Sequence, residues 1–222
     1  MSLFRINTED PFSGPHQNMQ VATAGSNLED ADIAMILVHG RGASAQSMLM
    51  FSDQFSVENV HFRALQANNH TWYPRSFMAP KEMNQPGIKS GIQAIHDQIT
   101  VVEETGIPLH KIILLGFSQG ACLTTEFAAR HPRRYGGIVG FSGGLIGKHI
   151  DPKNYRGSME QTPIFLGCSD QDPHIPQERV DETVQVFRQL SGDVTKRIYE
   201  GMGHTVIQDE IDFVNELLNN IN

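Results

Sequence analysis

The segment 116–120 (GFSQG) has the clearest chemical meaning in the chain, because it fits the pattern G-x-S-x-G. In that pattern the serine lies on a sharp turn between a strand and a helix, and its hydroxyl projects above the sheet. The run 112–115 is typical of a buried strand, and the run 121–129 is typical of a helix packed against a sheet. The motif therefore has the strand-turn-helix setting that its chemistry requires, and Ser118 is the predicted nucleophile.

A serine hydroxyl is a weak nucleophile until a base takes its proton. In the chain order expected for this motif, a carboxylate and then a histidine follow the serine. His204 is the best candidate base, because it lies after the last predicted strand and before the last predicted helix. Other histidines are weaker candidates: His131 ends the helix after Ser118, His149 lies in a polar loop, and His174 adjoins two carboxylates.

The acid is expected in the segment 167–176 (GCSDQDPHIP), directly after a predicted strand. Its role would be to hold the imidazole in the right tautomer and to stabilise the imidazolium as it forms. Asp170 and Asp172 both qualify, and the spacing does not decide between them. The other aspartate is expected to accept hydrogen bonds from backbone N–H groups in the loop.

Acyl transfer also needs two hydrogen-bond donors for the oxyanion of the tetrahedral intermediate. The backbone N–H of Gln119, next to the nucleophile, is one candidate. The glycine-rich segment 39–43 (HGRGA) follows the apolar run 33–38, and the backbone N–H of Arg41 is the second candidate. The side chain of Arg41 is either free to bind a substrate carboxylate or merely solvated, and solvation is the expectation.

The elements that must position these residues alternate along the chain. Apolar runs predict strands, and apolar residues at steps of three and four predict helices that begin near Ile88, Val180 and Ile207. This alternation predicts a mostly parallel sheet with helices on both faces, in three layers. The predicted strands are 33–38, 60–66, 112–116, 137–142, 164–167 and 196–200.

No domain boundary is visible, so residues 1–222 are expected to form a single domain, with an N-terminal segment over residues 1–30. Residues 68–87 are rich in Pro, Asn and aromatic residues and lack periodicity, which predicts a long loop near the active site. Its aromatic residues either line a substrate pocket or cover the sheet. The pocket residues predicted are Trp72, Tyr73, Phe77 and Ile175.

Composition excludes several classes of function. A net charge of −8 without a Lys/Arg cluster argues against nucleic-acid binding. No apolar run is long enough for stable membrane insertion. Residues 1–14 lack the apolar core of a signal peptide, and two cysteines make no disulfide framework, so a cytoplasmic protein is expected. No metal-ligand spacing or nucleotide-binding pattern is present, so neither a metal nor another cofactor is expected.

Four motifs, taken together, resemble the phospholipase/carboxylesterase family of α/β-hydrolases, which includes bacterial carboxylesterases and acyl-protein thioesterases. They are 39–42 (HGRG), 116–120 (GFSQG), 172–176 (DPHIP) and 201–204 (GMGH), in the family's order. The resemblance covers nearly the whole chain and implies the α/β-hydrolase fold. It also implies an esterase or thioesterase acting on small-molecule or acyl substrates through a Ser-His-Asp triad and an acyl-enzyme. The family pattern D-P-x-V-P implies that Asp172 is the acid.

The segment 72–74 (WYP) resembles a bacterial esterase branch more than the eukaryotic thioesterases, so the resemblance does not imply protein depalmitoylation. Some relatives dimerise, which makes a homodimer one state to test. Two alternative functions share the fold. A lactone hydrolase of the dienelactone hydrolase type usually has a cysteine nucleophile, so Ser118 argues against it. A non-catalytic binding protein would not need an intact Ser, His and Asp set.

Overall fold

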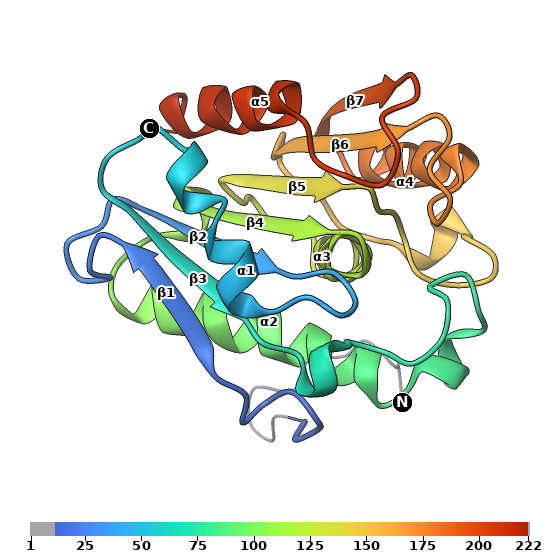
Figure 1. The fold of residues 1–222 in the computed structure, drawn as a ribbon, viewed down its shortest axis with the longest axis horizontal. Coiled ribbons are helices and arrows are strands. Elements are labelled where there is room, and N and C mark those ends of the chain that lie inside the picture. Colours follow the sequence, from blue (N-terminus) through green and yellow to red (C-terminus); the bar gives the residue numbers. More distant parts are fainter. Residues whose placement is uncertain (1–11, 222) are drawn as a thin grey trace.

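The computed structural model describes residues 12–221 (Figure 1). Residues 1–11 lie outside the described residues. They include most of residues 1–14, which were predicted to lack a signal peptide, and the first part of the predicted N-terminal segment 1–30. Later in that segment, residues 21–25 form a strand that was not predicted.

Seven strands form one sheet in the order β1-β3-β2-β4-β5-β6-β7. β1 pairs with β3 in the antiparallel sense, and every other neighbouring pair is parallel. The predicted mostly parallel sheet is therefore confirmed. The strands are β1 (Val21–Gly25), β2 (Ile33–Val38), β3 (Val60–Leu65), β4 (Ile112–Phe117), β5 (Gly137–Phe141), β6 (Pro163–Ser169) and β7 (Asp193–Tyr199).

Helices cover both faces of this sheet, which gives the three predicted layers (Figure 1). The apolar faces of α2 (Gly87–Glu104), α3 (Gln119–Arg130) and α4 (Gln177–Gln189) pack into one core on one side. The helices α1 (Ala45–Leu49) and α5 (Gln208–Asn219) pack into a second core on the other side. All six residues of β2 are buried, as expected for a central strand covered on both faces.

The sequence patterns missed two elements, β1 and α1. β1 is a short, partly exposed edge strand in which three of the five residues are alanine or glycine, so it has little hydrophobic signal. α1 has only five residues and is stabilised by a capping box between Ser44 and Ser47. The long segment 68–87 is not wholly irregular, because it contains the 3₁₀ helices η2 (Asn68–His70) and η3 (Lys81–Asn84). Three further 3₁₀ helices are η1 (Ser52–Gln54), η4 (Leu109–Lys111) and η5 (Pro152–Asn154).

Candidate active site

Ser118 occupies the sharp turn between β4 and α3. Its backbone has φ 54° and ψ −117°, a conformation that residues with a side chain rarely adopt. The two flanking glycines allow the turn to close. A Cβ atom on Gly120 would lie 2.0 Å from the carbonyl oxygen of Val38, and one on Gly116 would lie 2.5 Å from the backbone of Gly120. The turn therefore requires glycine at both positions for steric reasons.

The structure brings Ser118, His204 and Asp172 together at the carboxyl ends of the parallel strands. His204 Nε2 lies 2.8 Å from Ser118 Oγ, and His204 Nδ1 lies 2.7 Å from Asp172 Oδ2. An ionised carboxylate only accepts hydrogen bonds, so the proton on the ring lies on Nδ1. Nε2 is then left with a lone pair that can accept the hydrogen of the Ser118 hydroxyl.

The Asp172 side chain has no exposed area, and its second oxygen is also satisfied. Oδ1 accepts hydrogen bonds from the backbone N–H groups of His174, at 2.8 Å, and Ile175, at 3.0 Å. Burial acts to raise the pKa of Asp172, but the hydrogen bond from His204 and the two from the backbone outweigh it. The pKa of Asp172 therefore lies below its ordinary value, and the carboxylate is ionised at neutral pH.

Asp170, the other candidate acid, does not contact His204 but holds the loop in which His204 lies. Its Oδ1 accepts a hydrogen bond from the backbone N–H of Gly201 at 2.8 Å. The neighbouring Ser169 Oγ accepts one from Gly203 N–H at 3.1 Å. Asp170 therefore has the loop-stabilising role that was expected for whichever aspartate is not the partner of the histidine.

The other histidines lie in different settings. His174 stands edge-on to the ring of His204, with centroids 4.9 Å apart, and lines the same pocket. His149 is exposed, and the ring of His131 packs against Phe127. Of these three, only His174 lies at the site.

The two predicted oxyanion donors belong to residues that line the pocket containing Ser118. Gln119 is the first residue of α3, and the first N–H groups of a helix have no acceptor within it. Arg41 lies in a turn held by His39, whose Nδ1 lies 2.7 Å from the carbonyl oxygen of Gly40 and whose Nε2 accepts from Ala67 N–H at 3.0 Å. Burial lowers the pKa of His39, which favours the neutral tautomer with the proton on Nδ1.

The Arg41 side chain is exposed, as predicted, but it also makes hydrogen bonds within the protein. Its guanidinium donates to the hydroxyl of Thr71 at 3.0 Å and to the carbonyl oxygens of Tyr73 and Arg75 at 2.7 and 3.0 Å. These three acceptors all lie in the segment 68–87, which runs past the turn that carries Arg41. The side chain is therefore one of the groups that hold this segment beside Ser118.

Two further side chains hold the same segment, and the sequence patterns did not reveal them. The Gln119 side chain accepts from Trp72 N–H and donates to the Tyr73 carbonyl, both at 2.8 Å. His16 Nε2 lies 2.9 Å from the Trp72 carbonyl oxygen, and its Nδ1 accepts from Asn68 N–H at 3.1 Å. These partners lie 46 to 56 residues apart along the chain, so no local pattern predicts the contacts.

A cavity of about 380 Å³ opens at Ser118. Tyr73, Phe77 and Ile175 are in its wall, but Trp72 is not, and that pocket prediction is wrong. Trp72 is instead fully buried in the core, and its indole N–H donates to the carbonyl oxygen of His39 at 2.8 Å. The lining is Gly40, Arg41, Ala43, Tyr73, Arg75, Ser76, Phe77, Phe117, Ser118, Gln119, Cys122, His174, Ile175 and His204.

Cys122, one turn along α3 from Ser118, is the other nucleophile type in this lining. Burial raises the pKa of its thiol to about 12, so the thiol is protonated at neutral pH and is a poor nucleophile. Ser118 differs from Cys122 because a histidine that can accept its proton lies within hydrogen-bond distance.

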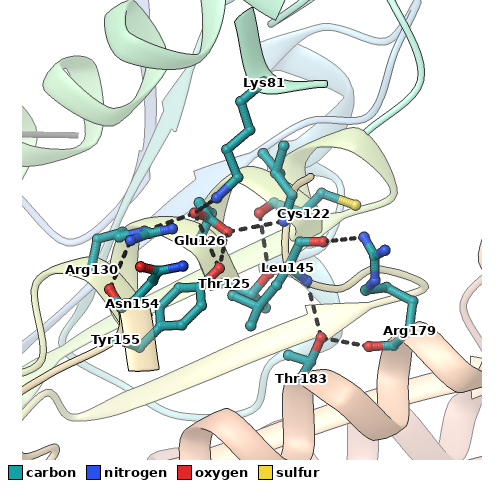
Figure 2. Close-up of polar contacts among 11 residues, drawn as sticks. Lys81, Cys122, Thr125, Glu126, Arg130, Leu145, Asn154, Tyr155, Arg179 and Thr183 are labelled. Carbon is teal, nitrogen blue, oxygen red and sulfur yellow. Dashed lines mark hydrogen bonds and ion pairs between the residues drawn. The ribbon is translucent and has the colours of Figure 1, made fainter. Parts of the chain in front are cut away.

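A buried carboxylate on α3 fastens the far end of the segment 68–87 (Figure 2). Glu126 lies 3.3 Å from Lys81 Nζ and 2.9 Å from Arg130 Nε, and its side chain has no exposed area. Its second oxygen accepts from Ile146 N–H at 2.9 Å and from the Tyr155 hydroxyl at 3.1 Å. Because Lys81 lies in η3, this cluster attaches the segment that forms the pocket wall to the helix that follows the nucleophile.

Comparison with known proteins places the chain in a family. The model of the phospholipase/carboxylesterase family matches residues 19–222. A crystal structure of a phospholipase/carboxylesterase from Dyadobacter fermentans is 38% identical, with a TM-score of 0.89 over 94% of this chain and 99% of that one. Acyl-protein thioesterase 1 of Kluyveromyces lactis is 33% identical over 90% of this chain and 98% of its own length.

A shorter match, to acyl-protein thioesterase 1 of Gibberella zeae, is 31% identical and spans 60% of this chain and 57% of that protein. Within residues 12–221, no helix is long and apolar enough to cross a bilayer. The family match, the likeness to the Dyadobacter structure and the fold agree with the motifs at Ser118 and His204. The chain belongs to the phospholipase/carboxylesterase family of serine hydrolases with the α/β-hydrolase fold.

Proposed function

We propose that this protein hydrolyses carboxylic esters or thioesters of small substrates through an acyl-enzyme on Ser118. His204 is the general base, and Asp172 orients its ring. The observation that carries this proposal is the unbroken chain of two hydrogen bonds, 2.8 Å from Ser118 to His204 and 2.7 Å from His204 to Asp172. This chain lies at a cavity that can admit a substrate.

The reaction follows from that geometry. Ser118 Oγ attacks the substrate carbonyl carbon while its proton passes to His204 Nε2, and the ionised Asp172 stabilises the imidazolium that forms. The backbone N–H groups of Arg41 and Gln119 hold the oxyanion. His204 then gives its proton to the leaving alkoxide or thiolate. A water molecule, deprotonated by the same nitrogen, attacks the acyl-enzyme; the bond between the acyl carbon and Ser118 Oγ then breaks, His204 returns the proton to Oγ, and the acid is released.

The size of the cavity supports small substrates. Its volume of about 380 Å³ lies near the lower end of the range of roughly 300 to 1,000 Å³ for small-molecule sites. Tyr73, Phe77 and Ile175 give it apolar walls, which suit a short hydrocarbon group. Similar proteins are named both as a carboxylesterase and as acyl-protein thioesterases, so an oxygen ester and a thioester are both appropriate first substrates.

The test combines labelling with turnover. A fluorophosphonate probe should label Ser118 in the folded protein, as read by mass spectrometry of its peptides. Ser118→Ala should lose the label and lower kcat/KM on 4-nitrophenyl butyrate by more than about 10⁴-fold. Ser158→Ala, at an exposed serine outside the pocket, is the matched control and should keep both.

Three results would overturn this proposal. Full esterase activity in Ser118→Ala would show that another group is the nucleophile. Folded wild-type protein that takes no label and turns over no ester would favour a binding protein. Turnover of a cyclic enol-lactone with none of linear esters or thioesters would favour a lactone hydrolase.

A further inference from the structure

Positive charge lines the pocket of an otherwise acidic protein. The chain has a net charge of −8, yet the residues that line the cavity include Arg41 and Arg75 and no aspartate or glutamate. The nearest carboxylate of the site, Asp172, is buried behind the ring of His204 and is paired with it. The cavity wall therefore carries positive charge, whereas the protein as a whole is negatively charged.

Neither arginine is neutralised. Within residues 12–221, no carboxylate lies within 4.0 Å of the guanidinium nitrogens of Arg41 or Arg75. The Arg41 guanidinium has neutral partners, two carbonyl oxygens and a hydroxyl, which occupy three of its five N–H donors and leave its charge in place. A cleft lined by charge of one sign attracts ligands of the other sign.

Arg75 is the arginine whose whole guanidinium is available to a ligand. Its side chain is exposed in the cavity wall, and among the described residues its guanidinium has no hydrogen-bond partner. Its backbone, in contrast, is fixed on both sides. The N–H of Arg75 donates to the buried Asn84 Oδ1 at 2.8 Å, and its carbonyl oxygen accepts from Arg41 Nη2 at 3.0 Å.

The backbone from which the Arg75 side chain extends is thus held in a constant position relative to Ser118. The side chains of Arg41 and Gln119 hold the segment around Arg75. In the proposed function, the backbone N–H groups of the same two residues bind the oxyanion. A cation positioned in this way can select a substrate by a charged group placed away from the ester bond. The flexible stem of the arginine then adjusts to the exact distance.

We infer that the site prefers esters or thioesters that carry a second, ionised carboxylate, which the Arg75 guanidinium binds. This inference rests on the proposed function and adds a substrate class to it. The planar fork of one guanidinium matches one carboxylate through two parallel hydrogen bonds. The apolar walls at Tyr73 and Phe77 contact the hydrocarbon between the carboxylate and the ester.

The experiment compares matched pairs of substrates that differ in one carboxylate. The first pair is 4-nitrophenyl hexanoate and the mono-4-nitrophenyl ester of adipic acid, which places the charge on the acyl side. The second is phenyl butyrate and 3-carboxyphenyl butyrate, which places it on the leaving group. The quantity measured is the ratio of kcat/KM for the anionic ester to that for the neutral ester, in the wild type and in each variant.

Arg75→Gln should lower this ratio about tenfold for at least one pair, which is the fold-change expected when one charge-assisted hydrogen-bonded contact at an exposed site is lost. Arg75→Lys should retain part of the preference, because it keeps the charge and loses the fork. Arg188→Gln, at an exposed arginine on α4 outside the cavity, removes the same charge and should leave the ratio unchanged. The wild-type ratio should fall as salt is added.

Equal ratios in the wild type and Arg75→Gln for both pairs would overturn the inference. A wild-type ratio that does not respond to salt would do the same without using any variant. Either result leaves the proposed function intact as long as the neutral esters are hydrolysed. Failure of the wild type to hydrolyse any of the four esters would instead count against the proposed function itself, so the two failures are distinguishable.

Discussion

Replacing Asp172 with asparagine tests the proposed triad with little change in shape. Asp172 Oδ1 accepts two backbone N–H groups, from His174 and Ile175, and Oδ2 faces His204 Nδ1. An asparagine in this position has to direct its carbonyl oxygen to the two N–H groups, because its NH₂ group cannot accept from them. The NH₂ group therefore faces His204.

That orientation determines the tautomer of His204. The asparagine NH₂ group donates to Nδ1, so the ring proton moves to Nε2, 2.8 Å from Ser118 Oγ. A protonated Nε2 cannot accept the serine proton, and the general base is lost. The loss should lower kcat by roughly 10⁴-fold, the size of effect known for this substitution in a Ser-His-Asp triad, which corresponds to about 5 kcal/mol in the activation free energy.

The assay is kcat on 4-nitrophenyl butyrate at neutral pH, with Asp170→Asn as the matched control. Asp170 Oδ1 accepts from Gly201 N–H, and an asparagine oxygen can accept the same bond, so this variant should stay within a few-fold of the wild type. The reasoning would be refuted if Asp172→Asn kept wild-type kcat while folded. It would also be refuted if Asp170→Asn were the more damaged of the two.

Two further predictions concern stability and the pocket wall. Burial raises the pKa of Glu210 to about 7, so the folded state favours the neutral carboxyl. The stabilising contribution of this neutral carboxyl is complete below the unfolded pKa of 4.5. It is lost as the pH rises through the folded pKa of about 7. Relative to Glu210→Gln, the wild type should therefore lose about 3 kcal/mol of unfolding free energy across that range, and urea unfolding curves that shift in parallel for both proteins would contradict this. Gln119→Met removes the two hydrogen bonds to Trp72 and Tyr73 at nearly constant volume, so it should lower the unfolding free energy by about 2 kcal/mol and raise KM. An unchanged KM and an unchanged denaturation midpoint would show that the Gln119 side chain does not hold the wall.

The sequence by itself was sufficient to predict the sharp strand-to-helix turn at Ser118 and the layered fold. The G-x-S-x-G turn requires glycine at Gly116, which approaches the backbone of Gly120, and at Gly120, which approaches Val38 of the neighbouring strand, so both requirements appear in one short motif. Buried parallel strands and amphipathic helices are likewise visible as local hydrophobic patterns, because each pattern reflects the period of its own element. The edge strand β1 was missed since its half-exposed residues carry no such pattern.

Tertiary structure alone decided which side chains meet. Asp170 and Asp172 are two residues apart in one loop; spacing alone did not distinguish them, and in the fold it is Asp172 that contacts His204. Segments distant in sequence also form the hydrogen bonds of Arg41 to the segment 68–87 and the buried contact of Trp72 with His39. Such contacts depend on how whole elements pack together. They cannot be predicted from hydrophobic periodicity, because periodicity reports only on the element in which it occurs. The sequence therefore predicted Ser118 from its own motif and Asp172 from a family pattern, whereas the contacts of Asp172 with His204 and the way the pocket wall is held became clear only in three dimensions.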